Sequence, residues 1–223
     1  RKIAYKLLGV PERPQPPNWL ATIGTAGHAW LEHQFDLDNL KRAELMEGQE
    51  RWYIETRLTV GYVPGLGFIT GSCDLYDRVT CTVVDWKFVG PTTLKKYKSH
   101  GPSTQYRCQA HLYGQGWRNL GLPVSRVMIV FLPRNAHLDE AYVWSEDFRP
   151  DIAKSTLDRL GQIHQVVAER GLDALPMLTT ADQYCGHCEF FKANSADPRE
   201  GCPGDPNAGV YQPQPALTLT SVS

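Results

Sequence analysis

The sequence contains no apolar run that approaches the roughly 20 residues of a membrane span. Its first residues also lack the apolar core of a signal peptide. These two absences argue against a membrane protein and predict an intracellular location as the default. Because the chain starts at Arg1 and not at Met, we expect some natural N-terminal sequence to be missing.

Acidic residues are absent from a long internal segment. The formal net charge of the chain is −1, which by itself argues neither for nor against a nucleic-acid partner. Between Trp86 and Leu138, however, there is no Asp or Glu. The same segment carries these basic residues: Lys87, Lys95, Lys96, Lys98, Arg107, Arg118, Arg126 and Arg134. Such a segment creates a local field that favours a polyanion, and we interpret it as a DNA or RNA contact. The alternative is a set of solvated faces whose counter-charges come from neighbouring segments.

Hydrophobic residues make up 42% of the 223 residues, enough for one continuous core. Their spacing predicts helices over 1–9, from residue 25 onward, over 103–121 and over 151–171, and strands over 51–60, 67–76, 81–89, 125–133 and 141–148. In the second helix we expect Thr25 as the N-cap, His28 in the first turn, and Ala29, Trp30 and Phe35 in the core. The chain is therefore predicted to be mixed α/β, with a largely antiparallel central sheet flanked by helices.

Two acidic residues and one lysine occupy neighbouring strands of this pattern. If the strands over 67–76 and 81–89 pair through the tight turn at 77–80, Asp74 and Asp85 come within about one register step of each other. Lys87 then projects on the same face as Asp85, because strand side chains alternate. Adjacent carboxylates repel unless a cation neutralises them, and such oxygen ligands suit Mg²⁺ or Mn²⁺. The simpler alternative is a surface salt bridge between Asp85 and Lys87, which leaves Asp74 unexplained.

Four motifs in a fixed order carry a resemblance to a known family. They are Gly24-Thr25-x-x-His28-x-x-Leu31-Glu32, Gly71-x-x-Asp74, Asp85-x-Lys87 and Gln109-x-x-x-Tyr113. This order resembles the RecB-like exonuclease branch of the PD-(D/E)XK nuclease superfamily, over residues 1 to 202. The resemblance implies a restriction-endonuclease-like core in a single nuclease domain, similar to CRISPR-adaptation and phage recombination exonucleases, and a bacterial or phage source.

The resemblance also implies a role for each matched residue. Asp74, Asp85, the backbone carbonyl of Trp86 and His28 would be metal ligands. The chemistry would be phosphodiester hydrolysis in DNA by water that Mg²⁺ or Mn²⁺ activates.

Three further matched residues would act on water and substrate. Lys87 would orient the attacking water and stabilise charge on the scissile phosphate, while Gln109 and Tyr113 would shape the site and touch the DNA backbone. Glu55 is a weaker candidate, because Glu in a strand usually faces solvent, and we leave it out of the predicted site. We also predict that Lys95, Lys96 and Lys98 meet DNA phosphates, because they follow Lys87 in the acid-free segment.

The cysteines fall into two groups. Cys73, Cys81 and Cys108 lie on predicted elements and are typical small core residues. Cys185, Cys188 and Cys202 form a C-terminal cluster over 185–202, ahead of a flexible tail at 203–223.

The resemblance implies that the C-terminal cysteines, with an N-terminal cysteine, bind a four-iron, four-sulfur (4Fe-4S) cluster. Two departures stand out: the gap from Cys188 to Cys202 is long, and no cysteine precedes Cys73, so we expect the fourth ligand upstream of Arg1. The alternatives are a Zn²⁺ site completed by His187, or three free thiols.

Two other functions stay open at this stage. One is a non-catalytic nucleic-acid-binding module that keeps the fold and the basic segment, although intact Asp74, Asp85 and Lys87 argue against it. The other is a zinc-binding interaction protein built around the C-terminal cysteines. Incubation with end-labelled DNA and divalent metal or EDTA distinguishes these from a nuclease.

Overall fold

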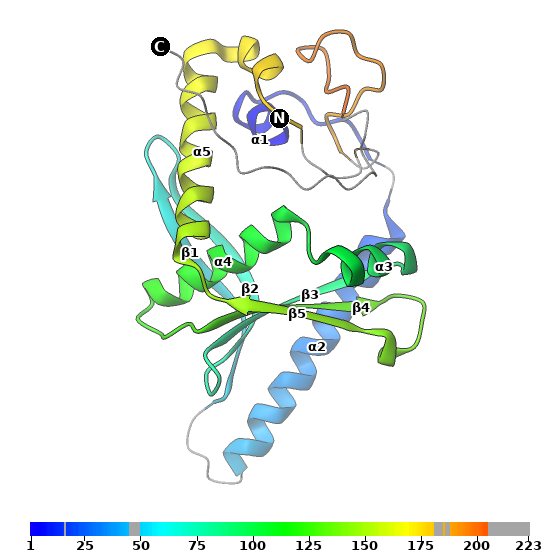
Figure 1. Cartoon of the computed structure of the whole chain (residues 1–223), viewed down its shortest axis with the longest axis vertical. Helices are drawn as coiled ribbons and strands as arrows, with labels where there is room; N and C mark the ends of the chain where they lie inside the picture. The colour runs from blue at the N-terminus through cyan, green and yellow to red at the C-terminus, as the bar shows by residue number, and fades with distance from the viewer. Residues whose placement is uncertain (16, 45–49, 181–184, 186–187, 205–223) are drawn as a thin grey trace. The chain divides into compact units, whose positions relative to one another are not determined.

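Five strands form one sheet in the order β1-β2-β3-β4-β5, which is also their order in the chain (Figure 1). They are β1 Trp52–Val63, β2 Gly67–Asp77, β3 Thr82–Val89, β4 Arg126–Pro133 and β5 Tyr142–Asp147. Neighbouring strands are antiparallel except β3 and β4, which are parallel because a helical segment connects them. The predicted α/β class, with a mixed and largely antiparallel sheet flanked by helices, is confirmed.

The computed structural model describes residues 1–15, 17–44, 50–180, 185 and 188–204. The chain divides into two compact units. Residues 17–162 form the unit that contains the sheet, and residues 1–16 together with 163–223 form the other. In the part of the chain that the structure describes, no helix is long and apolar enough to cross a membrane. The predicted single nuclease domain over 1–202 stays a prediction.

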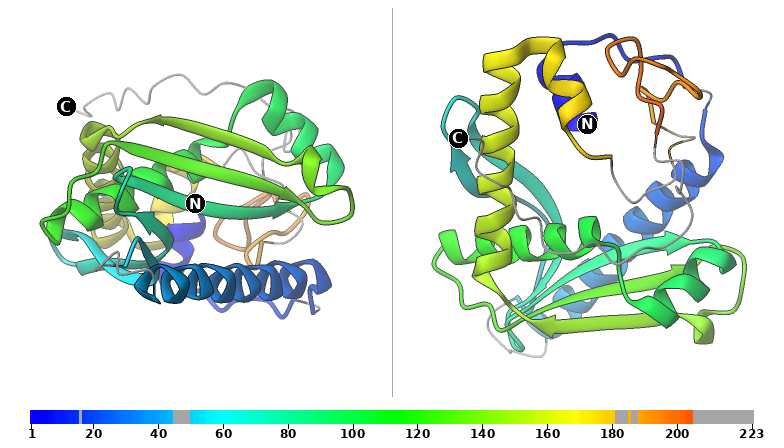
Figure 2. Two further views of the ribbon diagram at one scale, coloured as in Figure 1. Left: turned by 90° about the horizontal axis from the view of Figure 1, so that it is seen from below. Right: turned by 45° about the horizontal axis from the view of Figure 1, so that its top comes forward.

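Helix α2, Trp19–Glu44, covers one face of the sheet (Figure 2). The ring of Phe35 packs edge-on against Trp52 at 4.9 Å and stacks on Trp86 at 5.6 Å. The helix approaches β3 closely at Gly27, where a Cβ atom would lie 2.3 Å from the ring of Phe88. Glycine at this position therefore sets how near α2 lies to the sheet.

The predicted start of this helix is wrong. The helix begins six residues earlier than Thr25, and Asn18 caps it, because Asn18 Oδ1 accepts a hydrogen bond from the Leu20 amide at 3.1 Å. The Thr25 hydroxyl instead donates to the carbonyl of Ala21 one turn back. Of the predicted core residues, Phe35 is half-buried, but Ala29 and Trp30 are exposed.

Helix α4, Thr104–Asn119, covers the opposite face (Figure 2). Ser103 caps it by accepting a hydrogen bond from the Tyr106 amide at 3.4 Å. Trp117 stacks on Tyr76 at 4.7 Å and its indole N–H donates to the Cys73 thiol at 3.3 Å. Cys73 is fully buried there, as predicted for a core cysteine.

Two shorter helices connect the strands. Helix α3, Pro91–His100, links β3 to α4 and was not predicted. The short 3-10 helix η1, Leu138–Glu140, links β4 to β5. Helix α5, Pro150–Arg170, follows β5 close to the predicted bounds, and its residues up to 162 belong to the sheet unit.

The other unit joins the two ends of the sequence. Helix α1, Lys2–Leu7, and the 3-10 helix η2, Gly171–Met177, belong to it. Tyr5 stacks on Phe190 at 4.9 Å and donates a hydrogen bond to the carbonyl of Pro198. Its core contains Ala4, Tyr5, Val167, Ala174, Leu175, Phe190 and Cys202.

Candidate active site

Strands β2 and β3 stop pairing at two carboxylates. Their ladder consists of Leu75–Val84, Tyr76–Val83 and Asp77–Thr82, so the next step places Asp74 opposite Asp85, as the sequence predicts. Beyond the ladder a side chain provides the next link between the strands, because Asp74 Oδ2 accepts a hydrogen bond from the Trp86 amide at 2.8 Å. The register therefore brings two acids together where the strands begin to separate.

Asp85 is a buried acid whose hydrogen-bonding capacity is not used. The residue is 1% exposed, and neither carboxylate oxygen accepts a hydrogen bond of normal geometry from any residue that the structure describes. Lys87 Nζ lies 2.6 Å from Oδ2 as an ion pair, and also lies over the ring of Tyr106. Burial raises the pKa of Asp85, the ammonium group of Lys87 opposes this, and repulsion from Asp74 adds to it. Among the described residues Lys87 is thus the one close partner of Oδ2, and Oδ1 accepts no hydrogen bond, which leaves it open to a metal cation.

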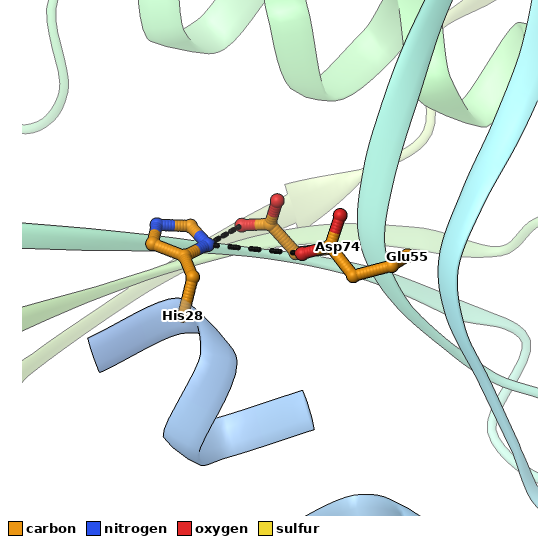
Figure 3. A group of neighbouring side chains, drawn as sticks. All are labelled: His28, Glu55 and Asp74. Atoms are coloured by element: carbon orange, nitrogen blue, oxygen red, sulfur yellow. Dashed lines mark ion pairs between the residues drawn. The ribbon is translucent and has the colours of Figure 1, made fainter. Parts of the chain in front are cut away.

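His28, Glu55 and Asp74 converge beside this pair (Figure 3). His28 Nδ1 lies 3.5 Å from Asp74 Oδ2 and 3.9 Å from Glu55 Oε1. One ligand atom from each of the three residues lies within 4.8 Å of the others, and this is the one such group among the described residues. Burial, and secondarily Lys87, lowers the pKa of His28, which favours the neutral imidazole that metals bind. The set of one nitrogen and two carboxylates suits a divalent cation.

The backbone of Trp86 also faces this group. Its hydrogen bond with His28 raises the pKa of the imidazole, against the larger effect of burial. The resemblance assigns the Trp86 carbonyl as a ligand. Its role as a metal ligand stays a prediction.

Glu55 is the residue that the sequence interpretation left out. A regular hairpin continued from the Val63–Gly67 pair would set Thr56 opposite Asp74. A bulge between Thr59 and Gly61 shifts the register by one residue and places Glu55 opposite Asp74 instead. The sequence analysis leaves Glu55 out because Glu in a strand usually faces solvent, and a single sequence gives no reliable sign of the bulge that places it beside Asp74.

The backbone of Glu55 is strained. Its φ angle of 40° lies in the left-handed region, where a side chain with a Cβ atom costs roughly 1–2 kcal/mol. Burial raises the pKa of Glu55, and the nearby carboxylates of Glu32 and Asp85 add to this. Strain and unfavourable charge at one position are typical of functional sites.

Gln109 and Tyr113 reach the site from α4, on the face opposite α2. Gln109 Nε2 donates to the Tyr113 hydroxyl at 2.9 Å. Burial raises the pKa of Tyr113 to about 12, with smaller contributions from Asp85 and Asp74. A Cβ atom on Gly71 would lie 2.9 Å from the Tyr113 ring, so glycine there leaves room for the tyrosine. The structure thus brings both residues beside the acids, and their contact with DNA stays a prediction.

An open cleft of about 530 Å³ leads to this group. Strands contribute Glu55 and Asp74 to it. Helix α2 lines the rest with Ala21, Gly24, Thr25, His28, Ala29 and Glu32. Because most of these α2 side chains are small, a bulky ligand can approach the helix closely.

The remaining predicted residues lie elsewhere. Lys95 and Lys98 are exposed on α3, and their contact with phosphates stays a prediction, as does that of Lys96. Cys81 lies in the turn before β3, with a φ angle of 53°, and Cys108 is half-buried on α4.

The C-terminal cysteines belong to the unit that lacks the sheet. Cys202 is buried and forms a β-bridge with Phe191, while the Cys188 amide donates to the Cys185 carbonyl at 2.9 Å. These three thiols do not form a second group of ligand atoms within 4.8 Å among the described residues. This arrangement does not support the predicted 4Fe-4S cluster or zinc site. His187, the predicted fourth zinc ligand, lies outside the described residues, as does the tail from residue 205.

Comparisons with known proteins give structural likenesses only. No protein-family model matches the chain, and no curated protein matches it. A solved structure named SSO0001 is 16% identical, with a TM-score of 0.42, over 70% of this chain and 65% of that one. An alkaline exonuclease from Laribacter hongkongensis is 12% identical, with a TM-score of 0.41, over 65% and 70% of the two chains. A phage-related exonuclease from Haemophilus somnus 129PT is 15% identical, with a TM-score of 0.41, over 75% and 79%.

These likenesses are weak. The chain spans 65% of the length of SSO0001, and every TM-score lies below 0.5. Two of the similar proteins are exonucleases, but likeness at this level carries no functional argument. We therefore rest the function on the chemistry of the site.

Proposed function

We propose that the chain is a Mg²⁺- or Mn²⁺-dependent deoxyribonuclease, an exonuclease of the RecB-like type that hydrolyses phosphodiester bonds in DNA. The observation that carries the proposal is the buried Asp85 carboxylate, which accepts no hydrogen bond of normal geometry from the described residues, beside His28, Glu55 and Asp74. A carboxylate left this way is costly unless a cation binds it. Lys87 offsets only part of this cost, since burial still raises the pKa of Asp85, and a divalent cation would offset the rest.

Each residue has a distinct task in this proposal. Asp74, Asp85, Glu55 and neutral His28 would hold the metal, and the bound ion would act as a Lewis acid toward phosphate and water. The ammonium group of Lys87 is fixed by Asp85 and by the ring of Tyr106, so it can orient a water molecule and neutralise charge that develops on the phosphate. The alternative for Lys87 is a simple surface salt bridge with Asp85. We favour the catalytic role, because Asp85 is almost fully buried.

The test combines cleavage with metal binding. End-labelled single-stranded and duplex DNA are incubated with the protein and Mg²⁺, Mn²⁺ or EDTA, and Mn²⁺ binding is measured by calorimetry. We expect metal-dependent release of nucleotides from strand ends. His28→Ala should weaken Mn²⁺ binding and lower the cleavage rate by about 100-fold.

His33→Ala is the matched control, because His33 is exposed on the same helix. It should bind Mn²⁺ and cleave like the unchanged protein. Absence of cleavage with any metal, together with absence of Mn²⁺ binding, would refute the proposal. Metal and DNA binding without cleavage would favour the non-catalytic module instead.

A further inference from the structure

The outer face of the β1–β2 hairpin forms a continuous track away from the candidate site. The register pairs Arg57 with Ser72, Thr59 with Thr70, and Tyr62 with Phe68. Because alternate residues share a face, Phe68, Thr70 and Ser72 point to the same side of β2 as Asp74. The track therefore begins at the acids and ends at the tip of the hairpin.

The chemistry of the track changes along its length. Next to the acids lie the Arg57 guanidinium and the hydroxyls of Ser72 and Thr70, with Arg57 Nη2 donating to Thr70 Oγ1 at 2.8 Å. At the tip lie two aromatic rings, Tyr62 at 60% exposure and Phe68 at 73%, which meet edge to face at 5.4 Å. No Asp or Glu occurs between residues 57 and 72. A cation, hydroxyl groups and aromatic rings, free of acids, are the groups that bind a nucleic-acid strand.

The hairpin presents these groups on a firm support. Its opposite face is buried through Leu58, Val60 and Val63, each at most 3% exposed. Gly61 also packs tightly against Leu157 of α5, which leaves no room for a Cβ atom there. Two large aromatic side chains are therefore held in solvent by a packed ribbon. Exposure of this aromatic surface to water is unfavourable, and a patch of exposed apolar side chains is typical of a binding site.

The length of the track matches a short piece of one strand. Phe68 precedes Asp74 by six residues, which is about 20 Å of extended chain. At the rise of about 3.4 Å per nucleotide in duplex DNA this distance holds roughly six nucleotides, which is an upper bound for a more extended single strand.

We propose that this face binds the unpaired strand of the nucleic acid whose end lies at the candidate site. This inference rests on the proposed nuclease function. Arg57 contacts a backbone phosphate, and Tyr62 and Phe68 stack on bases that lie up to about six nucleotides away. The ligand is single-stranded because stacking on a protein ring needs a base whose face is not already covered by a neighbour in a duplex.

The test measures binding without cleavage, in EDTA, by fluorescence anisotropy. The probes are a single strand of about 12 nucleotides, its duplex, and a strand shorter than about four nucleotides. We expect the double variant Tyr62→Ala, Phe68→Ala to bind the longer single strand about 10- to 100-fold more weakly, with binding of the duplex and of the short strand unchanged. Tyr62→Leu with Phe68→Leu, which keeps apolar bulk but removes the aromatic faces, should lose binding as well.

Trp30→Ala is the matched control, because Trp30 is an equally exposed aromatic residue on the outer side of α2. Arg57→Gln should reduce the dependence of log affinity on log salt by about 0.7. The proposal is wrong if the double variant binds the longer strand as tightly as Trp30→Ala does. It is also wrong if the double variant loses affinity for the duplex as much as for the single strand. Failure of the nuclease function is separate: the unchanged protein would then bind the strand but not cleave it when metal is added.

Discussion

Two clusters of charged side chains lie in the sheet unit, and they differ in how completely their hydrogen bonds are made. In the first cluster, Glu146 accepts hydrogen bonds from the Arg107 guanidinium and from His111 Nε2, and His111 Nδ1 accepts one from the Arg149 amide. In the second, Asp85 accepts none of normal geometry from the described residues. The same types of residue therefore build a closed network in one place and an open one in the other.

The pKa shifts of the two acids follow this difference. Burial alone would raise the pKa of Glu146, but the hydrogen bonds from Arg107 and His111 outweigh it and hold the pKa below its ordinary value. At Asp85 burial prevails over the attraction of Lys87, and the pKa rises. Charge on Glu146 thus stabilises the fold, whereas charge on Asp85 destabilises it until a cation binds. We infer that the first cluster serves the architecture and the second serves chemistry.

The sharpest way to separate the two clusters is to neutralise one acid in each. Asp85→Asn should lower metal-dependent cleavage by at least about 1000-fold, because it removes a metal ligand and the partner of Lys87. The free energy of unfolding should change little, because removal of the buried charge offsets the loss of the ion pair with Lys87. Glu146→Gln should do the reverse, lowering the free energy of unfolding by about 2 kcal/mol and leaving the cleavage rate near that of the unchanged protein.

Urea unfolding without metal and single-turnover cleavage provide the two measurements. If both substitutions lowered stability equally, the distinction between an open and a closed network would be wrong. Loss of cleavage in Glu146→Gln without loss of stability would place that cluster in the active site.

A smaller effect concerns the backbone of Glu55. Glu55→Gly and Glu55→Ala both remove the carboxylate, but only glycine tolerates a φ angle of 40° without strain. We expect the glycine variant to be more stable than the alanine variant by about 1 kcal/mol, with the same loss of Mn²⁺ affinity in both. Thermal unfolding and calorimetry measure the two quantities. Equal stabilities would mean that this position carries no backbone strain.

The smallest effect is a pH dependence of the closed network. Burial lowers the pKa of His111 below its ordinary 6.5, with Arg107 and Arg149 adding to this and Glu146 opposing it. The unfolded chain then binds a proton more readily than the folded one, so His111 contributes stability above pH 6.5 that is lost as the pH falls toward the lowered pKa. His111→Asn should be less stable at neutral pH, but its melting temperature should fall less between neutral and mildly acidic pH. A fall equal to that of the unchanged protein would contradict the assignment.

Several features of the fold follow directly from the sequence. The two strands are rich in β-branched residues and the turn between β2 and β3 is short, so the register that sets Asp74 opposite Asp85 could be predicted. The Gln109-x-x-x-Tyr113 motif also lies on the expected element, α4, because Ser103 and the apolar spacing define that helix.

Other features depend on packing that a single sequence does not display. The sequence does not mark the start of α2, because this helix carries apolar residues that stay exposed, including Trp19 and Trp30. Helix α3 lacks acidic residues in its first turn and a side-chain cap, so it gave no start signal beyond Pro91. Glu55 joined the site only through a bulge that lies between it and the turn.

The hydrogen bond from the Trp86 amide to Asp74 Oδ2 links the candidate site to the sheet itself. The same oxygen faces His28 at 3.5 Å, so one atom holds β3 beside β2 and also borders the group that would bind metal. Any change in electron density on that oxygen alters how firmly it holds the amide proton. Exchange of this proton with solvent deuterium therefore makes Trp86 an intrinsic probe of site occupancy, independent of any substrate.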